Sequence, residues 1–190
     1  MRITHAIAAG VLALALTSCG SDDEGSSDSP EATHNQADVE FAQQMIPHHQ
    51  QAVEMSELAA DSAGSPKVRA LAEEIEAAQG PEIEKLTGWL QEWDEDVPSN
   101  MSGMDHDMEG MDHGTMSGMM SPQQMDKLAK LNDKQFDRAF LTMMIEHHQG
   151  AVDMAETEAE QGKYDAALEM AEQIEKTQRA EIKQMSSILN

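Results

Sequence analysis

One stretch of this sequence occurs twice. The first copy, Met45–Met55, reads Met-Ile-Pro-His-His-Gln-Gln-Ala-Val-Glu-Met, and the second, Met144–Met154, reads Met-Ile-Glu-His-His-Gln-Gly-Ala-Val-Asp-Met. The offset from 45 to 144 is 99 positions, and at this offset Gln79 aligns with Gln178 without a gap. A repeat of this length that carries two helical patterns predicts a duplicated αα-hairpin.

Both copies carry an apolar stripe with helical spacing. At about 100° per residue, positions three and four apart lie on one face of a helix. One histidine of each pair lies within the stripe, and the other lies at its edge. We therefore expect His48 and His147 to face the core. The stripes are Phe41, Met45, His48, Ala52 and Met55 in the first copy and Phe140, Met144, His147, Ala151 and Met154 in the second.

Glycine, proline and polar residues between these patterns predict the helix boundaries. A helix that begins near Asp38 ends at Gly64, and Ser65-Pro66 starts the next one. Asn132-Asp133 divides the third helical region into a short helix and a long one. We expect an all-α four-helix bundle made of two repeated αα-hairpins. The expected segments are residues 38–96 for the first hairpin, 97–122 for a loop and 123–190 for the second hairpin.

The repeated motif resembles that of a known family. Phe-x-x-x-Met-Ile-x-His-His-Gln-x-Ala-Val-x-Met, followed on the next helix by Gln-x-x-Glu-Ile, is similar to the secreted bacterial family called domain of unknown function 305. The resemblance covers residues 38–93 and 137–189. It implies a four-helix bundle of ferritin-like shape and, as in members with an assigned function, copper binding outside the cytoplasm.

The N-terminus predicts export. A positively charged start is followed by an apolar run over residues 3–16, which is too short to cross a hydrocarbon layer of roughly 30 Å as an ordinary helix. The sequence Leu-Thr-Ser-Cys ending at Cys19 resembles a bacterial lipobox. We expect residues 1–18 to be a lipoprotein signal peptide and a lipidated Cys19 to anchor the protein to the cell membrane or envelope. The alternative is a plain secretory signal with an unmodified cysteine.

Charge and composition limit the partners. Residues 19–37 are rich in Ser, Asp, Glu and Gly, which predicts a disordered linker in which His34 is solvated. The formal net charge of -24 repels nucleic acid and anionic lipid surfaces and favours cations as partners. Cys19 is the only cysteine, so methionine is the soft metal ligand that the folded part of the chain offers.

The loop over residues 97–122 has its own metal-binding chemistry. It contains seven methionines and two Met-Asp-His triplets among glycines and acids, and this composition predicts a flexible segment rather than a buried one. Thioethers prefer Cu(I) and Ag(I), whereas imidazole binds both oxidation states of copper. We expect the loop to collect copper through Met101, Met104, His106, Met108, Met111, His113, Met116, Met119 and Met120.

The helical histidines offer a second kind of site, in one of two forms. Each copy could chelate an ion alone, because residues three or four apart on a helix are neighbours. Alternatively, His48 and His147 could share a central site, with Glu82 and Glu181 as ligands or as hydrogen-bond partners of the ligands. The candidate ligands on the helices are Met45, His48, His49, Met55, Met144, His147, His148 and Met154.

Three other interpretations compete with copper binding. The histidines could be structural, with His48 bonded to Glu82 and His147 bonded to Glu181. A ferritin-like di-metal oxidase or iron handler would need Glu-x-x-His motifs at the helical histidines, but the residues three positions before them are Met45, Ile46, Met144 and Ile145. A structural envelope lipoprotein would leave the Met-Asp-His loop unexplained.

Together these observations predict an exported, lipid-anchored copper-binding protein that is not an enzyme. We expect it to sequester copper or hand it to a delivery protein, with Cu(I) favoured and Cu(II) also bound.

Overall fold

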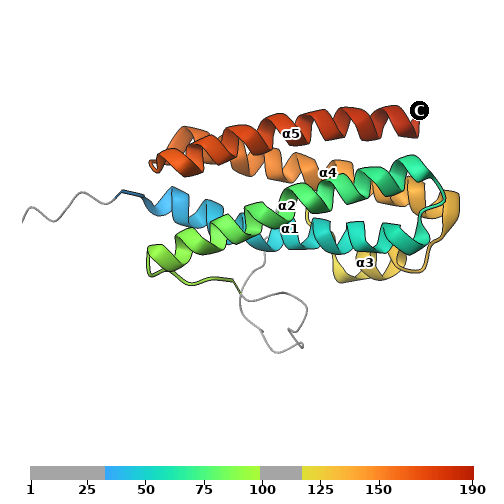
Figure 1. Ribbon diagram of the computed structural model, residues 1–190, viewed down its shortest axis with the longest axis horizontal. Helices are drawn as coiled ribbons and strands as arrows, with labels where there is room; N and C mark the ends of the chain where they lie inside the picture. Colours follow the sequence, from blue (N-terminus) through green and yellow to red (C-terminus); the bar gives the residue numbers. More distant parts are fainter. Residues whose placement is uncertain (1–32, 99–116) are drawn as a thin grey trace, which may run out of the picture. The chain divides into compact units, whose positions relative to one another are not determined.

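The computed structural model describes residues 33–98 and 117–190. Within these ranges the chain forms helices only, apart from an isolated bridge between Ala63 and Asp133, which confirms the all-α prediction (Figure 1). None of these helices is long and apolar enough to cross a membrane. They are α1 (Gln36–Ser62), α2 (Pro66–Glu92), α3 (Pro122–Leu128), α4 (Asp133–Gln161) and α5 (Asp165–Leu189).

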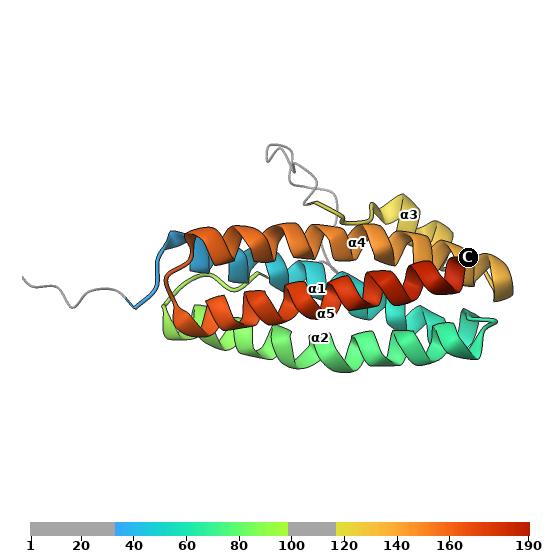
Figure 2. The ribbon, with the colours of Figure 1, turned by 90° about the horizontal axis from the view of Figure 1, so that it is seen from above.

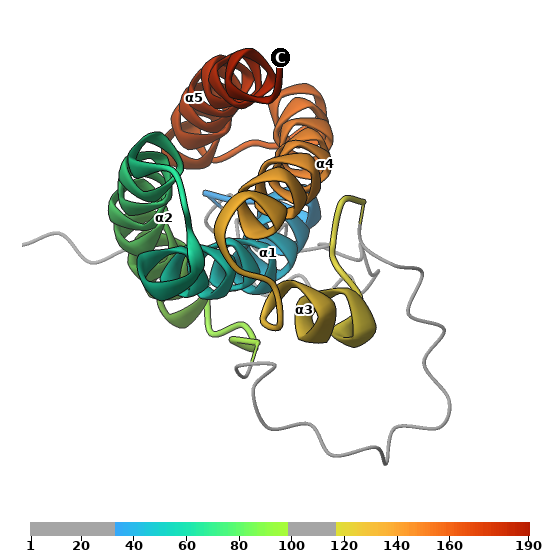
Figure 3. The ribbon, with the colours of Figure 1, turned by 90° about the vertical axis from the view of Figure 1, so that its right-hand side faces the viewer.

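The four long helices form the predicted bundle. Helices α1 and α2 pair as one hairpin, α4 and α5 pair as the other, and α1 packs against α4 between them (Figure 2). The short helix α3 lies outside the four-helix arrangement, against α4, as the view along the bundle shows (Figure 3).

Local signals in the sequence start the helices. Asn35 caps α1 by accepting from the backbone N–H groups of Ala37 and Asp38, while Asp38 accepts from the Asn35 N–H at 2.6 Å. Ser65 caps α2, and Pro66 occupies its first turn as the sequence predicted. The division near Asp133 is also confirmed, because α3 ends at Leu128 and α4 begins at Asp133.

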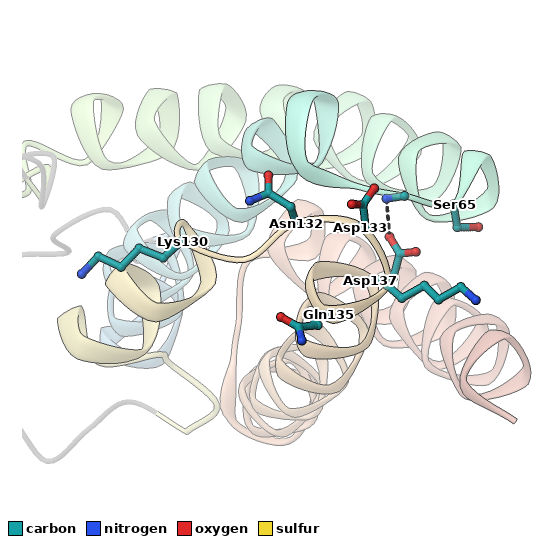
Figure 4. Close-up of a pocket in the computed structure, with 8 residues that line it drawn as sticks. Ser65, Lys130, Asn132, Asp133, Gln135 and Asp137 are labelled. Atoms are coloured by element: carbon teal, nitrogen blue, oxygen red, sulfur yellow. Dashed lines mark hydrogen bonds between the residues drawn. The ribbon is translucent and has the colours of Figure 1, made fainter.

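The turns at one end of the bundle pack closely. The N–H of Gly64 donates to Oδ1 of Asp137 at 3.0 Å, and a Cβ atom on Gly64 would lie 2.8 Å from the Cα of Asp133. These residues border a hollow of about 670 Å³, which Ser65 and Asn132 also line (Figure 4). This hollow lies at the turns that precede α2 and α4, so neither histidine pair lines it.

The opposite end carries an aromatic cluster that includes the first residues described. His34 stacks on Trp93, with ring centroids 4.3 Å apart, and Tyr164 contacts both Trp89 and Trp93 edge-on. The prediction that His34 is a solvated linker residue was wrong, because Trp93 offers a flat apolar surface that covers one face of the imidazole.

The apolar core divides into two clusters. One cluster contains the second halves of α1 and α5, the first halves of α2 and α4, and Leu128 of α3, and the other contains the opposite halves of the long helices. His48 lies between Met45 of the second cluster and Ala52 of the first, and His147 lies between Met144 of the first and Ala151 of the second. The histidines therefore form a polar layer between two apolar regions.

Candidate functional site

The polar layer consists of buried side chains contributed by all four long helices. His48 and His49 on α1 and His147 and His148 on α4 each have 0% of their surface exposed. Gln79 of α2 is also buried, as is its repeat equivalent on α5. We call these four histidines and two glutamines, Gln79 and Gln178, the histidine layer.

His48 and His147 meet at the centre of this layer. Their ring centroids are 3.7 Å apart, and the ring planes are inclined by 36°. Burial, followed by the nearby histidines, lowers the pKa of His48 to about 3 and the pKa of His147 well below its usual value. Both rings are therefore neutral at neutral pH, which allows them to lie against each other and leaves each with a lone pair for a metal.

The other two histidines bond to carboxylates. His49 Nε2 lies 2.7 Å from Oε2 of Glu82, and His148 Nε2 lies 2.6 Å from Oε2 of Glu181. The structural alternative, which paired the carboxylates with His48 and His147, was wrong by one residue in each helix. One residue turns the side chain by about 100°, so the first histidine of each pair faces the bundle axis and the second faces the neighbouring helix of its own hairpin.

These hydrogen bonds select the histidine tautomers. A carboxylate or carbonyl oxygen only accepts, so the ring nitrogen facing it carries the proton, and the lone pair of a neutral ring lies on the other nitrogen. In their neutral form, His49 and His148 therefore carry the lone pair on Nδ1. His48 does the same, because its Nε2 lies 3.2 Å from the backbone oxygen of Ser117. In protein metal sites, a hydrogen bond of this kind orients the histidine and raises its basicity.

Several buried atoms of the histidine layer lack hydrogen-bond partners among the described residues. They include Nδ1 of all four histidines, Nε2 of His147, both side-chain polar atoms of Gln79 and Oε1 of Gln178. Each unsatisfied buried group of this kind costs about 1–3 kcal/mol. Such a layer is a poor core but a suitable receptor, because a bound cation would use the free lone pairs.

Methionines complete the donor set. Within the described ranges, no three His, Cys, Asp or Glu side chains form a group that could hold a metal ion. Thioether sulfur is the donor that the buried methionines could add to the imidazoles. Met45 and Met144, one turn before the histidines, are fully buried, as is Met55. Met154 is half-buried and lines a hollow of about 90 Å³ beside Phe41.

The Met/His-rich loop falls partly within the described residues. Met119 is half-buried, and Met120 is only 6% exposed in the first apolar cluster. The prediction of a wholly flexible loop was wrong for its last residues. The side-chain amide of Gln51 forms hydrogen bonds with both the N–H and the carbonyl oxygen of Met120. The remaining loop candidates and Cys19 lie outside the described residues. These loop candidates are Met101, Met104, His106, Met108, Met111, His113 and Met116.

Ser117 was not among the candidate residues, although its carbonyl orients His48. No motif marks it, since any residue supplies a backbone oxygen. Gln79 and Gln178 did carry a signal: they recur at the repeat offset beside the apolar stripe, in the Gln-x-x-Glu pattern.

A duplicated helical hairpin with a buried histidine layer defines the class of this protein as a four-helix bundle with a candidate metal site at its centre. The chain belongs to the family described as a domain of unknown function, DUF305, whose model matches residues 38–189. This finding confirms the resemblance predicted from the sequence. Among curated proteins, no sequence matches the chain.

Solved structures share this fold, among them two that are described as DUF305 proteins. A DUF305 protein from Streptomyces coelicolor is 34% identical, with a TM-score of 0.70 over 80% of this chain and 90% of that chain. A DUF305 fragment from Deinococcus radiodurans is 30% identical, with a TM-score of 0.71 over 83% and 98% of the two chains. CopM in its Cu(II)-bound form is 35% identical, with a TM-score of 0.65 over 80% and 95%.

Proposed function

We propose that this protein binds copper outside the cytoplasm and sequesters it or hands it to a delivery protein, without catalysing a reaction. The observation that carries the proposal is the histidine layer, in which buried imidazole nitrogens without hydrogen-bond partners among the described residues lie one helical turn from buried thioethers. Imidazole and thioether together favour copper over the harder divalent cations. Structures of CopM with Cu(II), Cu(I) and Ag bound support the proposal from a related fold.

The helical site would use His48 and His147 as its central ligands. Met45 and Met144 are the nearest thioethers along each helix and lie fully buried in opposite apolar clusters. Glu82 and Glu181 would orient His49 and His148 through the observed hydrogen bonds rather than bind the metal directly. A soft, desolvated donor set of this kind favours Cu(I), and the imidazoles also accommodate Cu(II).

Cellular placement is the second part of the proposal. The signal sequence and the lipobox-like residues support export and an anchor at Cys19, and the acidic linker would give the bundle reach from the membrane. The Met/His-rich loop would collect copper from solution with lower specificity than the bundle.

The positions of the carboxylates count against a di-metal oxidase. In the described residues, Glu82 and Glu181 each bond a histidine of their own hairpin. A di-metal carboxylate centre instead needs glutamates that project together into the bundle core and bridge the ions.

Metal analysis of histidine variants tests the bundle site. Changing His48, His49, His147 and His148 together to Ala should lower the copper content by about one ion per chain or more. His34→Ala is the matched control, because His34 lies against Trp93 and outside the histidine layer. Unchanged copper content with a lower Tm in the fourfold variant would instead show that the histidines are structural.

A synthetic peptide tests the loop. A peptide that spans residues 101–120 should compete for Cu(I) with a colorimetric chelator, and the same peptide with Leu at each Met should compete poorly. Competition by neither peptide would remove the loop from the proposal and leave the bundle site to stand alone, whereas equal competition by both would assign Cu(I) binding to His106 and His113 instead of the methionines.

A further inference from the structure

Residues 117–120 lie against α1 and α4 at the level of the histidine layer and form hydrogen bonds to both helices. We call them the clasp. The Ser117 oxygen faces His48 Nε2 at 3.2 Å, and the Ser117 hydroxyl donates to Oδ2 of Asp153 on α4 at 3.2 Å. The Met120 N–H donates to Oε1 of Gln51 at 2.6 Å, and Gln51 Nε2 donates back to the Met120 oxygen at 2.9 Å.

The two repeats differ at the position that the clasp requires. Gln51 on α1 and Gly150 on α4 are equivalent, since 51 plus 99 is 150. A Cβ atom on Gly150 would lie 1.8 Å from the Ser117 oxygen, so only glycine leaves room for the clasp there. Gly118 also has to be glycine. Its φ is +80°, and a Cβ atom there would lie 2.5 Å from the backbone oxygen of Glu146.

The clasp also contributes two methionines. Met119 is half-buried, whereas Met120 is 6% exposed and packs in the apolar cluster that contains Met55 and Met144. Gln51, which holds the Met120 backbone, lies three residues after His48 and therefore on the same helix face. Met119 is therefore accessible to solvent in part, whereas the next residue, Met120, lies in the interior.

We infer that the clasp is the entry step for the histidine layer, with Met119 and Met120 as successive thioether ligands for a soft monovalent ion on its way to His48 and His147. This inference rests on the proposed function. Each step exchanges one neutral donor for another, sulfur for sulfur and then sulfur for nitrogen, so no electron or proton is transferred. The Ser117 oxygen keeps the lone pair of His48 on Nδ1 throughout.

The test uses the full chain with Ag(I), which does not change oxidation state. NMR signals of 15N-labelled histidine rings show whether Ag(I) is bound in the histidine layer. Exchange spectroscopy at half saturation then gives the rate at which the metal-free and Ag(I)-bound forms interconvert. Gly150→Ala should lower this rate at least about tenfold, because the added methyl group displaces the clasp. Gly88→Ala is the matched control, since a Cβ atom there meets nothing within 4 Å.

Two further variants keep the result decisive if Gly150→Ala does not fold. Gln51→Ala removes the bonds to Met120 without adding atoms, and the double change Met119→Leu and Met120→Leu removes the sulfurs but keeps the clasp's backbone bonds. Both should slow the loading of the histidine layer. Unchanged rates in these variants, with Ag(I) still reaching the layer, would overturn the entry step and leave the proposed function intact. No Ag(I) at the layer in the unaltered protein would instead overturn the proposed function.

Discussion

The imidazole rings of His48 and His147 lie against each other at the centre of the bundle, with their centroids 3.7 Å apart, although the two residues are 99 positions apart in the sequence. Equivalent positions of a duplicated hairpin meet only where the pseudo-twofold axis passes between the repeats. The pairs His49–Glu82 and His148–Glu181 repeat the same arrangement on either side of this point. Duplication has therefore brought two half-sites together into one layer.

The first prediction concerns stability without metal. His147→Leu should raise the free energy of unfolding of the chelator-treated protein by about 1–2 kcal/mol, because it removes a buried ring whose nitrogens lack partners. His49→Leu should lower it, because the bond to Glu82 is lost. Urea unfolding of both variants measures the difference. A loss of stability in His147→Leu as large as that in His49→Leu would mean that His147 is a structural residue.

The second prediction concerns the carboxylates behind the histidines. Glu82→Gln and Glu181→Gln should each weaken copper binding about 10–100-fold and leave the number of ions bound unchanged, because the amide orients the imidazole less strongly than the carboxylate. Competition titration measures the affinity. Glu84→Gln, an exposed change on the same helix as Glu82, should have no effect. A lost ion in either layer variant would instead make that glutamate a direct ligand.

Apolar spacing was enough to predict the helices and the bundle. The stripe through Met45 and His48 and its repeat through Met144 and His147 determine which face of each helix is buried, and the structure buries all four side chains. This worked because periodicity and the repeat offset are properties of the sequence itself. The start at Ser65 and the break near Asp133 followed from local capping chemistry.

The partners across the bundle could not be predicted in the same way. Which histidine meets Glu82 depends on how α1 and α2 rotate against each other, and a shift of one residue exchanges His48 for His49. The clasp could not be predicted either, because its contact with His48 uses a backbone oxygen. The sequence carries one trace of this contact: Gln51 in the first repeat is replaced by Gly150 in the second.

The third prediction separates sulfur ligands from apolar filling. Met45→Leu and Met144→Leu conserve volume and should change the free energy of unfolding by less than about 1.5 kcal/mol. Cu(I) affinity should fall more than Cu(II) affinity, because thioether sulfur favours the softer ion. Titrations under reducing and aerobic conditions measure both. Met170→Leu, in the second apolar cluster, is the control. Equal affinities in all three variants would assign Met45 and Met144 to the core alone.

The fourth prediction concerns two carboxyl groups at the end of the bundle near the α4–α5 turn. Asp38 is fully buried and accepts from the backbone N–H groups of Asn35, Lys163 and Tyr164, so it joins the start of α1 to this turn. Glu158 beside it is 1% exposed. Burial, followed by the neighbouring Asp38 carboxylate, raises the pKa of Glu158 from 4.5 to about 8. The folded protein therefore keeps a proton on Glu158 that the unfolded chain releases.

The sign of the pH dependence follows from this proton. A raised pKa stabilises the fold fully below about pH 4.5, and this contribution is lost as pH rises through about 8. The free energy of unfolding should therefore fall by roughly 2–4 kcal/mol over that range. Glu158→Gln, which cannot ionise, should flatten the curve, whereas the exposed change Glu160→Gln should leave it unaltered. Urea unfolding from pH 5 to pH 8 measures the free energy of unfolding of both variants. The same slope in both would show that Glu158 is ionised in the folded protein.

Asp38 does not contribute to this slope. Its pKa is lowered from 3.8, so its contribution to the free energy of unfolding changes only in more acidic solutions.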